Sequence, residues 1–152
     1  MHEPARARAL LGPDVVYLED AGATLMGFRF WGSPWQPEFN DWAFNLPRGA
    51  ALREKWGAIP EGIDVLVTHG PPAGIGDRVA TAGRQGCVDL RERVRQVRPR
   101  VHLFGHIHQD GGLWLVEGTT FANVWTWECE RAPTVIDVER GEIRAVSVPP
   151  TH

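Results

Sequence analysis

The fold is decided by the segment Val101-His102-Leu103-Phe104-Gly105-His106-Ile107-His108. An apolar run ends in a glycine and then presents two histidines at positions i and i+2, which is the pattern of a buried strand that delivers metal ligands at its carboxyl end. Alternate residues of an extended segment point the same way, so His106 and His108 are expected to share a face while Ile107 turns into the core.

A second segment repeats this design, Asp64-Val65-Leu66-Val67-Thr68-His69-Gly70-Pro71-Pro72. It is a short hydrophobic strand that ends in His69, and the turn residues after it stop it at once. Three imidazoles at the carboxyl ends of two strands, His69, His106 and His108, are therefore predicted to form a metal cluster. Neutral imidazole suits zinc, iron, manganese and nickel alike, so the sequence does not name the metal. The other histidines are interpreted as structural, hydrogen-bonded residues: His2, His102 and His152.

Length, charge and cysteine usage bound the class of protein. The chain has 152 residues and is predicted to form a single domain over residues 1–152. Its net charge of −3 offers no basic field to a nucleic-acid polymer or an anionic membrane, and no apolar stretch approaches the ~18 residues of a membrane span. The two cysteines, Cys87 and Cys129, lack a CxxC spacing, so reduced thiols in a cytoplasmic protein are expected.

Glycine and proline punctuate the chain, with 17 and 12 residues respectively, and favour a loop-rich α/β protein. Helices are predicted from about residue 47 to Trp56, with Leu52 and Trp56 on one face, and over residues 87–97. The aromatic segment 38–47 is expected either to pack as a loop or to wall a cleft. Other strands are predicted at 15–18, 24–31, 113–116, 119–124, 134–139 and 143–148, the last four as an antiparallel set.

Together, the two histidine segments resemble the C-terminal half of calcineurin-like metallophosphoesterases, in which one strand ends in His-Gly-Pro-Pro and a later strand ends in Gly-His-x-His. The resemblance is strongest to metallophosphoesterase-domain proteins of the branch likened to class III cyclic-nucleotide phosphodiesterases, and it covers nearly the whole chain. Further matching segments, in order, are Gly32-Ser33-Pro34-Trp35, residues 44–49, Ile59-Pro60-Glu61-Gly62, Gly76-Asp77-Arg78, Gly86-Cys87 and Phe121-x-Asn123.

The resemblance implies an α/β (α+β) fold, a two-sheet β-sandwich flanked by helices, with ligands on loops at strand ends. It also implies two divalent metal ions (manganese, iron or zinc), about 3.5–4 Å apart, which clamp an in-line displacement at phosphorus. His69 and His106 would bind one metal and His108 the other. The implied activity is hydrolysis of small phosphoric esters, including nucleotides or cyclic nucleotides.

Three polar residues outside the histidine segments are candidates for supporting roles in such a site. Asp77 and Arg78, in the loop after His69, are placed to approach a substrate phosphate, with a salt-bridged surface loop as the open alternative. Asn123 is a candidate to support the ligating histidines from behind, with a turn or a sheet pair as its alternative.

The chain departs from the family at its start. The motifs Asp-x-His, Gly-Asp-x-x-Asp and Gly-Asn-His-Glu/Asp are absent from the sequence. The bridging carboxylate, the asparagine ligand and the histidine that protonates the leaving group are absent with them, so no catalytic acid is assigned. By resemblance, residues 4–11 correspond to the helix that follows the asparagine motif. The fold is therefore expected to lack its N-terminal strands and to expose a strand edge or apolar surface, which invites a homodimer partner or the missing N-terminal segment.

Three interpretations of function remain open. In the first, the chain is part of a metal-dependent phosphoesterase that is completed by further polypeptide. In the second, it is a non-catalytic remnant or binding module that keeps the fold. In the third, His69, His106 and His108 hold a single zinc ion with a water molecule, which requires all three imidazoles to converge at ~2.0–2.1 Å from one ion.

Overall fold

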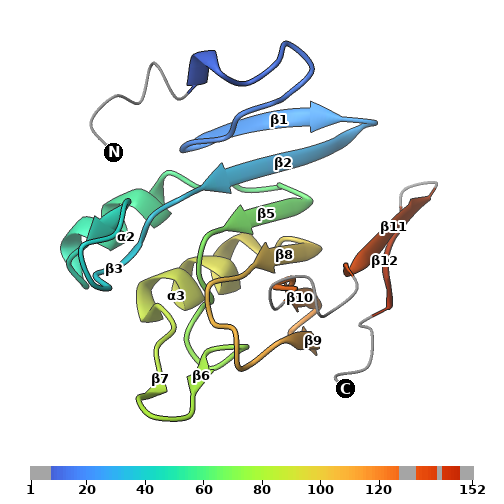
Figure 1. Cartoon of the computed structure of the whole chain (residues 1–152). Coiled ribbons are helices and arrows are strands. Elements are labelled where there is room, and N and C mark those ends of the chain that lie inside the picture. The colour runs from blue at the N-terminus through green and yellow to red at the C-terminus, as the bar shows by residue number, and fades with distance from the viewer. Residues whose placement is uncertain (1–7, 127–132, 140–141, 148–152) are drawn as a thin grey trace.

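The structure is a computed structural model that describes residues 8–126, 133–139 and 142–147. Its centre is a six-stranded mixed sheet with strand order β1-β2-β5-β8-β10-β9 (Figure 1). The inner strands β2, β5, β8 and β10 are parallel, and the outer strands β1 and β9 are antiparallel to their neighbours. The bounds are β1 Ala21–Leu25, β2 Phe28–Ser33, β5 Val65–Thr68, β8 Val101–Phe104, β9 Gly112–Val116 and β10 Thr119–Asn123.

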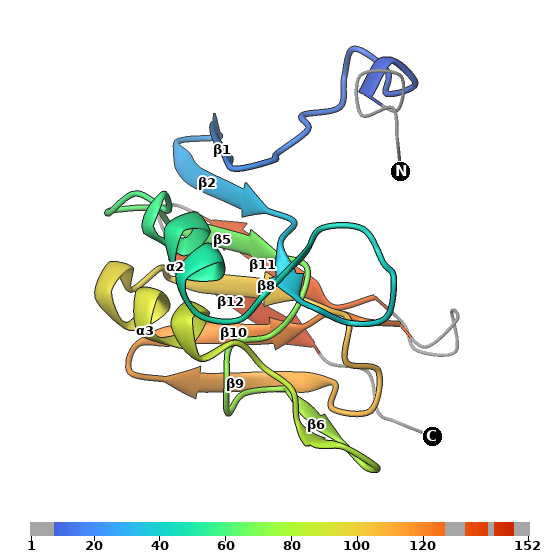
Figure 2. The same cartoon turned by 90° about the vertical axis from the view of Figure 1, so that its left-hand side faces the viewer.

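Two helices, α2 (Ala50–Gly57) and α3 (Val88–Val97), cover one face of this sheet, as Figures 1 and 2 show from two directions. The apolar residues predicted to share a face of α2 are buried, as are those of α3 except Val88, which is 68% exposed. The core combines sheet residues with helix residues, namely Leu66, Phe104 and Phe121 with Leu52, Trp56, Leu90, Val94 and Val97. Cys87 caps the start of α3, where its Sγ accepts a hydrogen bond from the backbone N–H of Leu90.

A separate antiparallel pair, β11 (Val135–Glu139) and β12 (Glu142–Ser147), lies on the side of the main sheet opposite the helices (Figures 1 and 2). The prediction of an α/β fold is confirmed in its coarser form, a mixed six-stranded sheet with two helices. In the part of the chain that the structure describes, the second layer of the expected sandwich consists of this one hairpin.

The prediction that the last four strands form one antiparallel set is wrong, because β9 and β10 belong to the main sheet while β11 and β12 form a separate pair. The clearest departure is β10. This strand pairs with β9 in the antiparallel sense but also with β8 in the parallel sense, and so belongs to the main sheet. The reason is burial. Four of its five residues are buried, including both Phe121 and its neighbour Ala122 on the opposite face. A strand that is buried on both faces belongs in the interior of a sheet and not at its edge.

The predicted hairpin of residues 15–18 with 24–31 is wrong. The observed hairpin joins β1 (Ala21–Leu25) to β2 (Phe28–Ser33), so its turn lies inside the predicted second strand. The connecting residues Met26 and Gly27 both have positive φ, 50° and 83°, as a two-residue type I′ turn requires. That turn fixes the register in which Leu25 faces Phe28. The conformation of the turn at Met26 and Gly27 therefore determines where β1 lies, although residues 15–18 have the higher strand propensity.

Two smaller ribbons border the carboxyl edge of the main sheet. One joins β3 (Gln36–Pro37) to β4 (Asn45–Leu46) in parallel, and the other joins β6 (Arg78–Val79) to β7 (Gly83–Arg84) in antiparallel. No helix in the described part of the chain is long and apolar enough to cross a membrane. The residues His2, Cys129 and His152, and residues 4–7 of the expected first helix, lie outside the described residues.

The substitution Leu66→Ala tests the core. Leu66 is 0% exposed at the centre of the main sheet, so we expect a loss of about 2–5 kcal/mol in the free energy of unfolding, measured by urea titration. Leu115→Ala is the matched control, because Leu115 is 76% exposed on the edge strand β9, and its change is expected to stay within about 0.5 kcal/mol. Equal losses in the two variants would contradict this description of the core.

Candidate metal centre

His69 and His106 meet at the carboxyl ends of two neighbouring parallel strands, β5 and β8. The Nε2 atom of His69 lies 3.0 Å from the Nδ1 atom of His106. The two strand ends are also tied together through the backbone, since the N–H of Gly105 donates to the carbonyl of His69 at 3.0 Å. The sequence prediction that these two histidines come together agrees with this geometry.

His108 does not join them. Its ring stacks on Trp125, with ring centroids 3.8 Å apart and an interplanar angle of 9°. The segment is not extended as expected, because β8 ends at Phe104 and His106 has a left-handed backbone with φ 68°. Ile107 is nevertheless buried, as expected, and His106 and His108 both line one cavity. Among the described residues, no group of three or more His, Cys, Asp or Glu side chains is placed to hold a metal ion.

Asn123 organises the loop that carries both His106 and His108. Its Nδ2 donates to the carbonyl oxygens of Ile107 at 2.7 Å and Asp110 at 2.9 Å, and it is buried at the end of β10. Its Oδ1 accepts from the N–H of Trp125 at 3.3 Å, which fixes the residue on which His108 stacks. Asn123 thus acts on the histidines through backbone groups.

His102 supports His69 from inside the core. The Oγ1 of Thr68 donates to the carbonyl of Gly70 at 2.8 Å, so it accepts from the Nε2–H of His102 at 2.8 Å. Burial lowers the pKa of His102 to about 3, with a further contribution from the positive charge of Arg91. His102 is therefore a neutral, structural residue, as the sequence suggested, and it holds the turn on which His69 stands.

Burial also keeps the two meeting histidines neutral. It lowers the pKa of His69, and it lowers the pKa of His106 to about 4, with smaller contributions from the charges of His69 and His108. Neutral imidazoles have a lone pair to offer a metal ion, and they release no proton when they bind one. The pair is thus chemically suited to metal ligation near neutral pH.

The geometry of this pair fits two of the four ligands of a tetrahedral metal ion. Two nitrogens bound at 2.0–2.1 Å to one tetrahedral ion lie about 3.3 Å apart, close to the separation of 3.0 Å between the His69 and His106 nitrogens. A dinuclear centre does not fit the described residues by themselves, because among them no third metal-ligating side chain joins the pair.

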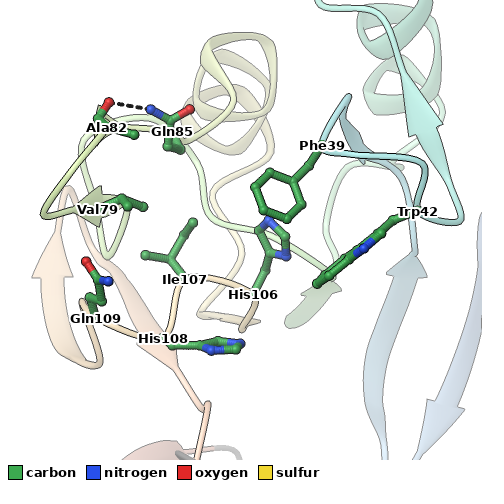
Figure 3. A pocket seen from close by; sticks show the side chains of 9 residues that line it. All are labelled: Phe39, Trp42, Val79, Ala82, Gln85, His106, Ile107, His108 and Gln109. Atoms are coloured by element: carbon green, nitrogen blue, oxygen red, sulfur yellow. Dashed lines mark hydrogen bonds between the residues drawn. The ribbon is translucent and has the colours of Figure 1, made fainter.

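The aromatic segment before β4 forms a wall beside the histidines, as Figure 3 shows. Phe39 and Trp42 both meet the ring of His106 edge to face, at centroid distances of 5.1 and 5.9 Å. Asn45 holds their loop by donating from its Nδ2 to the carbonyls of Phe39 and Asn40. A cavity of about 260 Å³ opens here, lined by Phe39, Trp42, Val79, Ala82, Gln85, His106, Ile107, His108 and Gln109.

Asp77 does not face this cavity. It is 0% exposed, and its carboxylate accepts from the backbone N–H of Gly74 at 2.8 Å and forms an ion pair with Arg84 at 2.6 Å. We therefore assign Asp77 to closing its own loop, which corrects the expectation that it approaches a phosphate. Arg78 is exposed on β6, and its contact with a substrate phosphate stays a prediction.

Three contacts of the site were not foreseen from sequence. Two of them join residues that are distant in sequence, namely the stacking of His108 on Trp125 and the hydrogen bond between His102 and Thr68. The contact of Phe39 with His106 had one signal, the concentration of aromatic residues in the segment 38–47, which the analysis left between a packed loop and a cleft wall.

Comparison with known proteins gives the family relationship. No protein-family model matches the chain. The human protein "Metallophosphoesterase domain-containing protein 1" is 50% identical over 129 residues, which cover 81% of this chain, and the mouse protein of the same name matches equally. The chain spans 40% of the length of these curated relatives. A solved crystal structure matches with a TM-score of 0.55 and 22% identity over 75% of this chain and 47% of that one, which supports the fold alone.

The pH dependence of stability tests the role of His102. Its pKa is lowered in the folded state, so between about pH 6.5 and pH 3 the unfolded chain binds a proton that the folded chain does not. Stability should therefore fall as the pH falls through this range, by about 1 kcal/mol per pH unit from this residue. In urea titrations, His102→Gln is expected to have a shallower pH slope than the unsubstituted chain by that amount, and identical slopes would refute the assignment.

Hydrogen exchange tests the role of Asn123. Asn123→Ala removes the buried donor that holds the loop 105–110, so we expect a loss of about 1–3 kcal/mol in stability and faster amide exchange in that loop. Thr120→Ala, on the same strand but in contact with Val101 across the sheet, serves as the control and should leave the loop unchanged. Unaltered exchange at 105–110 in Asn123→Ala would show that other contacts hold the loop.

Proposed function

Because this chain is homologous to part of the metallophosphoesterase domain-containing proteins, we propose that it contributes two histidine ligands to a centre that hydrolyses phosphoric esters with the help of metal ions. The observation that carries the proposal is the His69–His106 pair. Its nitrogens lie 3.0 Å apart at the carboxyl ends of two parallel strands, the edge of an α/β sheet at which ligands bind. Both imidazoles are neutral near pH 7, because burial lowers the pKa of each.

A divalent cation (manganese, iron or zinc) would supply Lewis-acid activation of the phosphoryl group and of a water molecule. In this chain, His69 and His106 would hold one cation. Asn123 and the Thr68–His102 contact keep those imidazoles in place through the loops on which they stand. Stacking on Trp125 occupies a face of the His108 ring and does not by itself exclude a second cation, because the nitrogen lone pairs lie in the plane of the ring.

The cavity beside the pair supports a small substrate that carries a flat apolar group, such as a nucleotide or a cyclic nucleotide. Phe39 and Trp42 are 45% and 53% exposed, so each presents ring surface to a bound group as well as to His106. A volume of about 260 Å³ suits a small ester and not a polymer. A net charge of −3 likewise gives no attraction for a nucleic-acid chain. Arg78 is exposed and directly precedes Val79, which lines the cavity.

The proposed hydrolysis belongs to a complete unit in which further polypeptide supplies carboxylate ligands. The described residues bring two nitrogens together and no third metal-ligating side chain. Two cations held by imidazoles alone would repel each other strongly, since nothing between them carries negative charge. The completing polypeptide is either the segment that the relatives carry and this chain does not match, or a partner subunit.

A non-catalytic binding module is the second candidate. It is favoured because, among the described residues, no group of three or more metal-ligating side chains comes together. The single-zinc arrangement has less support than either, since it needs all three imidazoles around one ion and no such group occurs among the described residues. The module predicts a stable chain that binds no metal and hydrolyses no ester.

Metal content and turnover distinguish these candidates. Purified chain is loaded with manganese or zinc, its metal is counted by plasma mass spectrometry, and hydrolysis of bis-p-nitrophenyl phosphate is followed. We expect bound metal that is lost at least about tenfold in His69→Ala and His106→Ala, each of which removes one of two ligands, but retained in the neighbouring control Gln109→Ala.

Each outcome has a definite meaning. Metal retention with manganese-dependent turnover shows a site that is completed in the purified protein. Metal retention without turnover shows a ligand pair that awaits the rest of the unit. Chain that retains no metal and has no turnover contradicts the proposal and leaves the binding module.

A further inference from the structure

Two side-chain amides stand across the cavity from its aromatic wall. Gln85 and Gln109 line the side that faces Phe39 and Trp42, as Figure 3 shows. Both glutamines are exposed, so their amides are open to a bound group. A primary amide has an acceptor oxygen and a donor nitrogen, and an end that the protein does not engage is available to a ligand. The hydrogen bonds that each amide makes within the protein therefore decide what it offers to the cavity.

Each glutamine holds one end of its amide against the turn of the β6–β7 ribbon. The Oε1 of Gln109 accepts from the backbone N–H of Ala80 at 2.6 Å, and the Nε2 of Gln85 donates to the carbonyl of Ala82 at 2.5 Å. A backbone N–H requires an oxygen opposite it and a carbonyl requires an N–H, so the orientation of both amides is fixed. Within the described part of the chain, the Nε2 of Gln109 and the Oε1 of Gln85 make no hydrogen bond. This wall therefore presents one free donor and one free acceptor.

The ribbon that anchors both amides is itself held in place. The buried carboxylate of Asp77 accepts from the N–H of Gly86 at 3.2 Å, and the carbonyl of Asp77 accepts from the N–H of Gln85 at 2.9 Å. From the other side, the carboxylate of Asp110 accepts from the N–H of Arg78 at 2.9 Å, which ties the ribbon to the loop that carries the two histidines. A donor and an acceptor that are already positioned lose little conformational entropy when a ligand binds.

We propose that Gln85 and Gln109 are specificity-determining residues, which select a ring with hydrogen-bonding groups on its edge, as in a nucleobase, over a hydrocarbon ring of the same size. Phe39 and Trp42 offer apolar surface to the face of the ring. At its edge, the Nε2–H of Gln109 donates to a ring nitrogen or carbonyl, and the Oε1 of Gln85 accepts from an amine or ring N–H. A hydrocarbon ring displaces water from both amide ends and pairs with neither. The inference rests on the proposed function for the place of the substrate, in the cavity beside the histidine pair.

Binding of neutral nucleosides without metal tests the selection. Isotope-labelled chain is titrated with adenosine and with a riboside that carries a phenyl ring in place of the base, and the NMR signal of the Trp42 indole N–H gives both dissociation constants. We expect adenosine to bind at least about tenfold more tightly. Gln109→Glu keeps the oxygen that accepts from Ala80 but lacks the donor, and Gln85→Met lacks both ends of the amide. Each should weaken adenosine binding at least about fivefold and leave the phenyl riboside within about twofold.

The matched control is Gln96→Glu, which makes the same change of charge at an exposed position of α3 and should keep the preference for adenosine. The amide spectrum of each variant checks that its fold is intact. The proposal is overturned if adenosine leaves the Trp42 signal unchanged, if it binds no more tightly than the phenyl riboside, or if its preference survives both cavity variants. Nucleosides carry no phosphate and the titration contains no metal. Preference without hydrolysis therefore counts against the proposed function alone, and hydrolysis without preference counts against this inference alone.

Discussion

The parallel pairing of β5 with β8 is the constraint on which the candidate centre depends. Val65 faces Val101 and Val67 faces Leu103, and the next link of the same ladder joins Gly105 to the carbonyl of His69. The two imidazoles meet because both strands stop at the same level. A slip of the ladder by one residue would turn the apolar residues of β5 to the wrong faces and would also separate the histidines.

The sequence was most informative where burial follows a simple period. Leu52 and Trp56 on one helix face, and the apolar runs before His69 and His106, follow such periods and were predicted. Prediction failed where local geometry or distant contacts decide. The turn lies at Met26 and Gly27, the backbone of His106 is left-handed, and the ring of His108 stacks on Trp125. None of these features leaves a periodic pattern in the sequence.

The two faces of the main sheet are covered to different extents. The helical face supplies the packed core around Leu66, Phe104 and Phe121, and it also holds His102 beneath the site. The other face is only partly covered, by one hairpin, and it becomes more exposed toward the histidines. The packed core therefore lies mainly on the helical side of the sheet.

The backbone of His106 has a consequence for how such a site changes over time. A φ of 68° is a conformation that glycine adopts freely and that costs a residue with a Cβ about 1–2 kcal/mol. At this position a histidine supplies an imidazole but strains the backbone, whereas a glycine relieves the strain but supplies no ligand. Where the imidazole confers no advantage, selection for stability alone favours glycine at this position. Loss of the ligand is then a change that stabilises the fold.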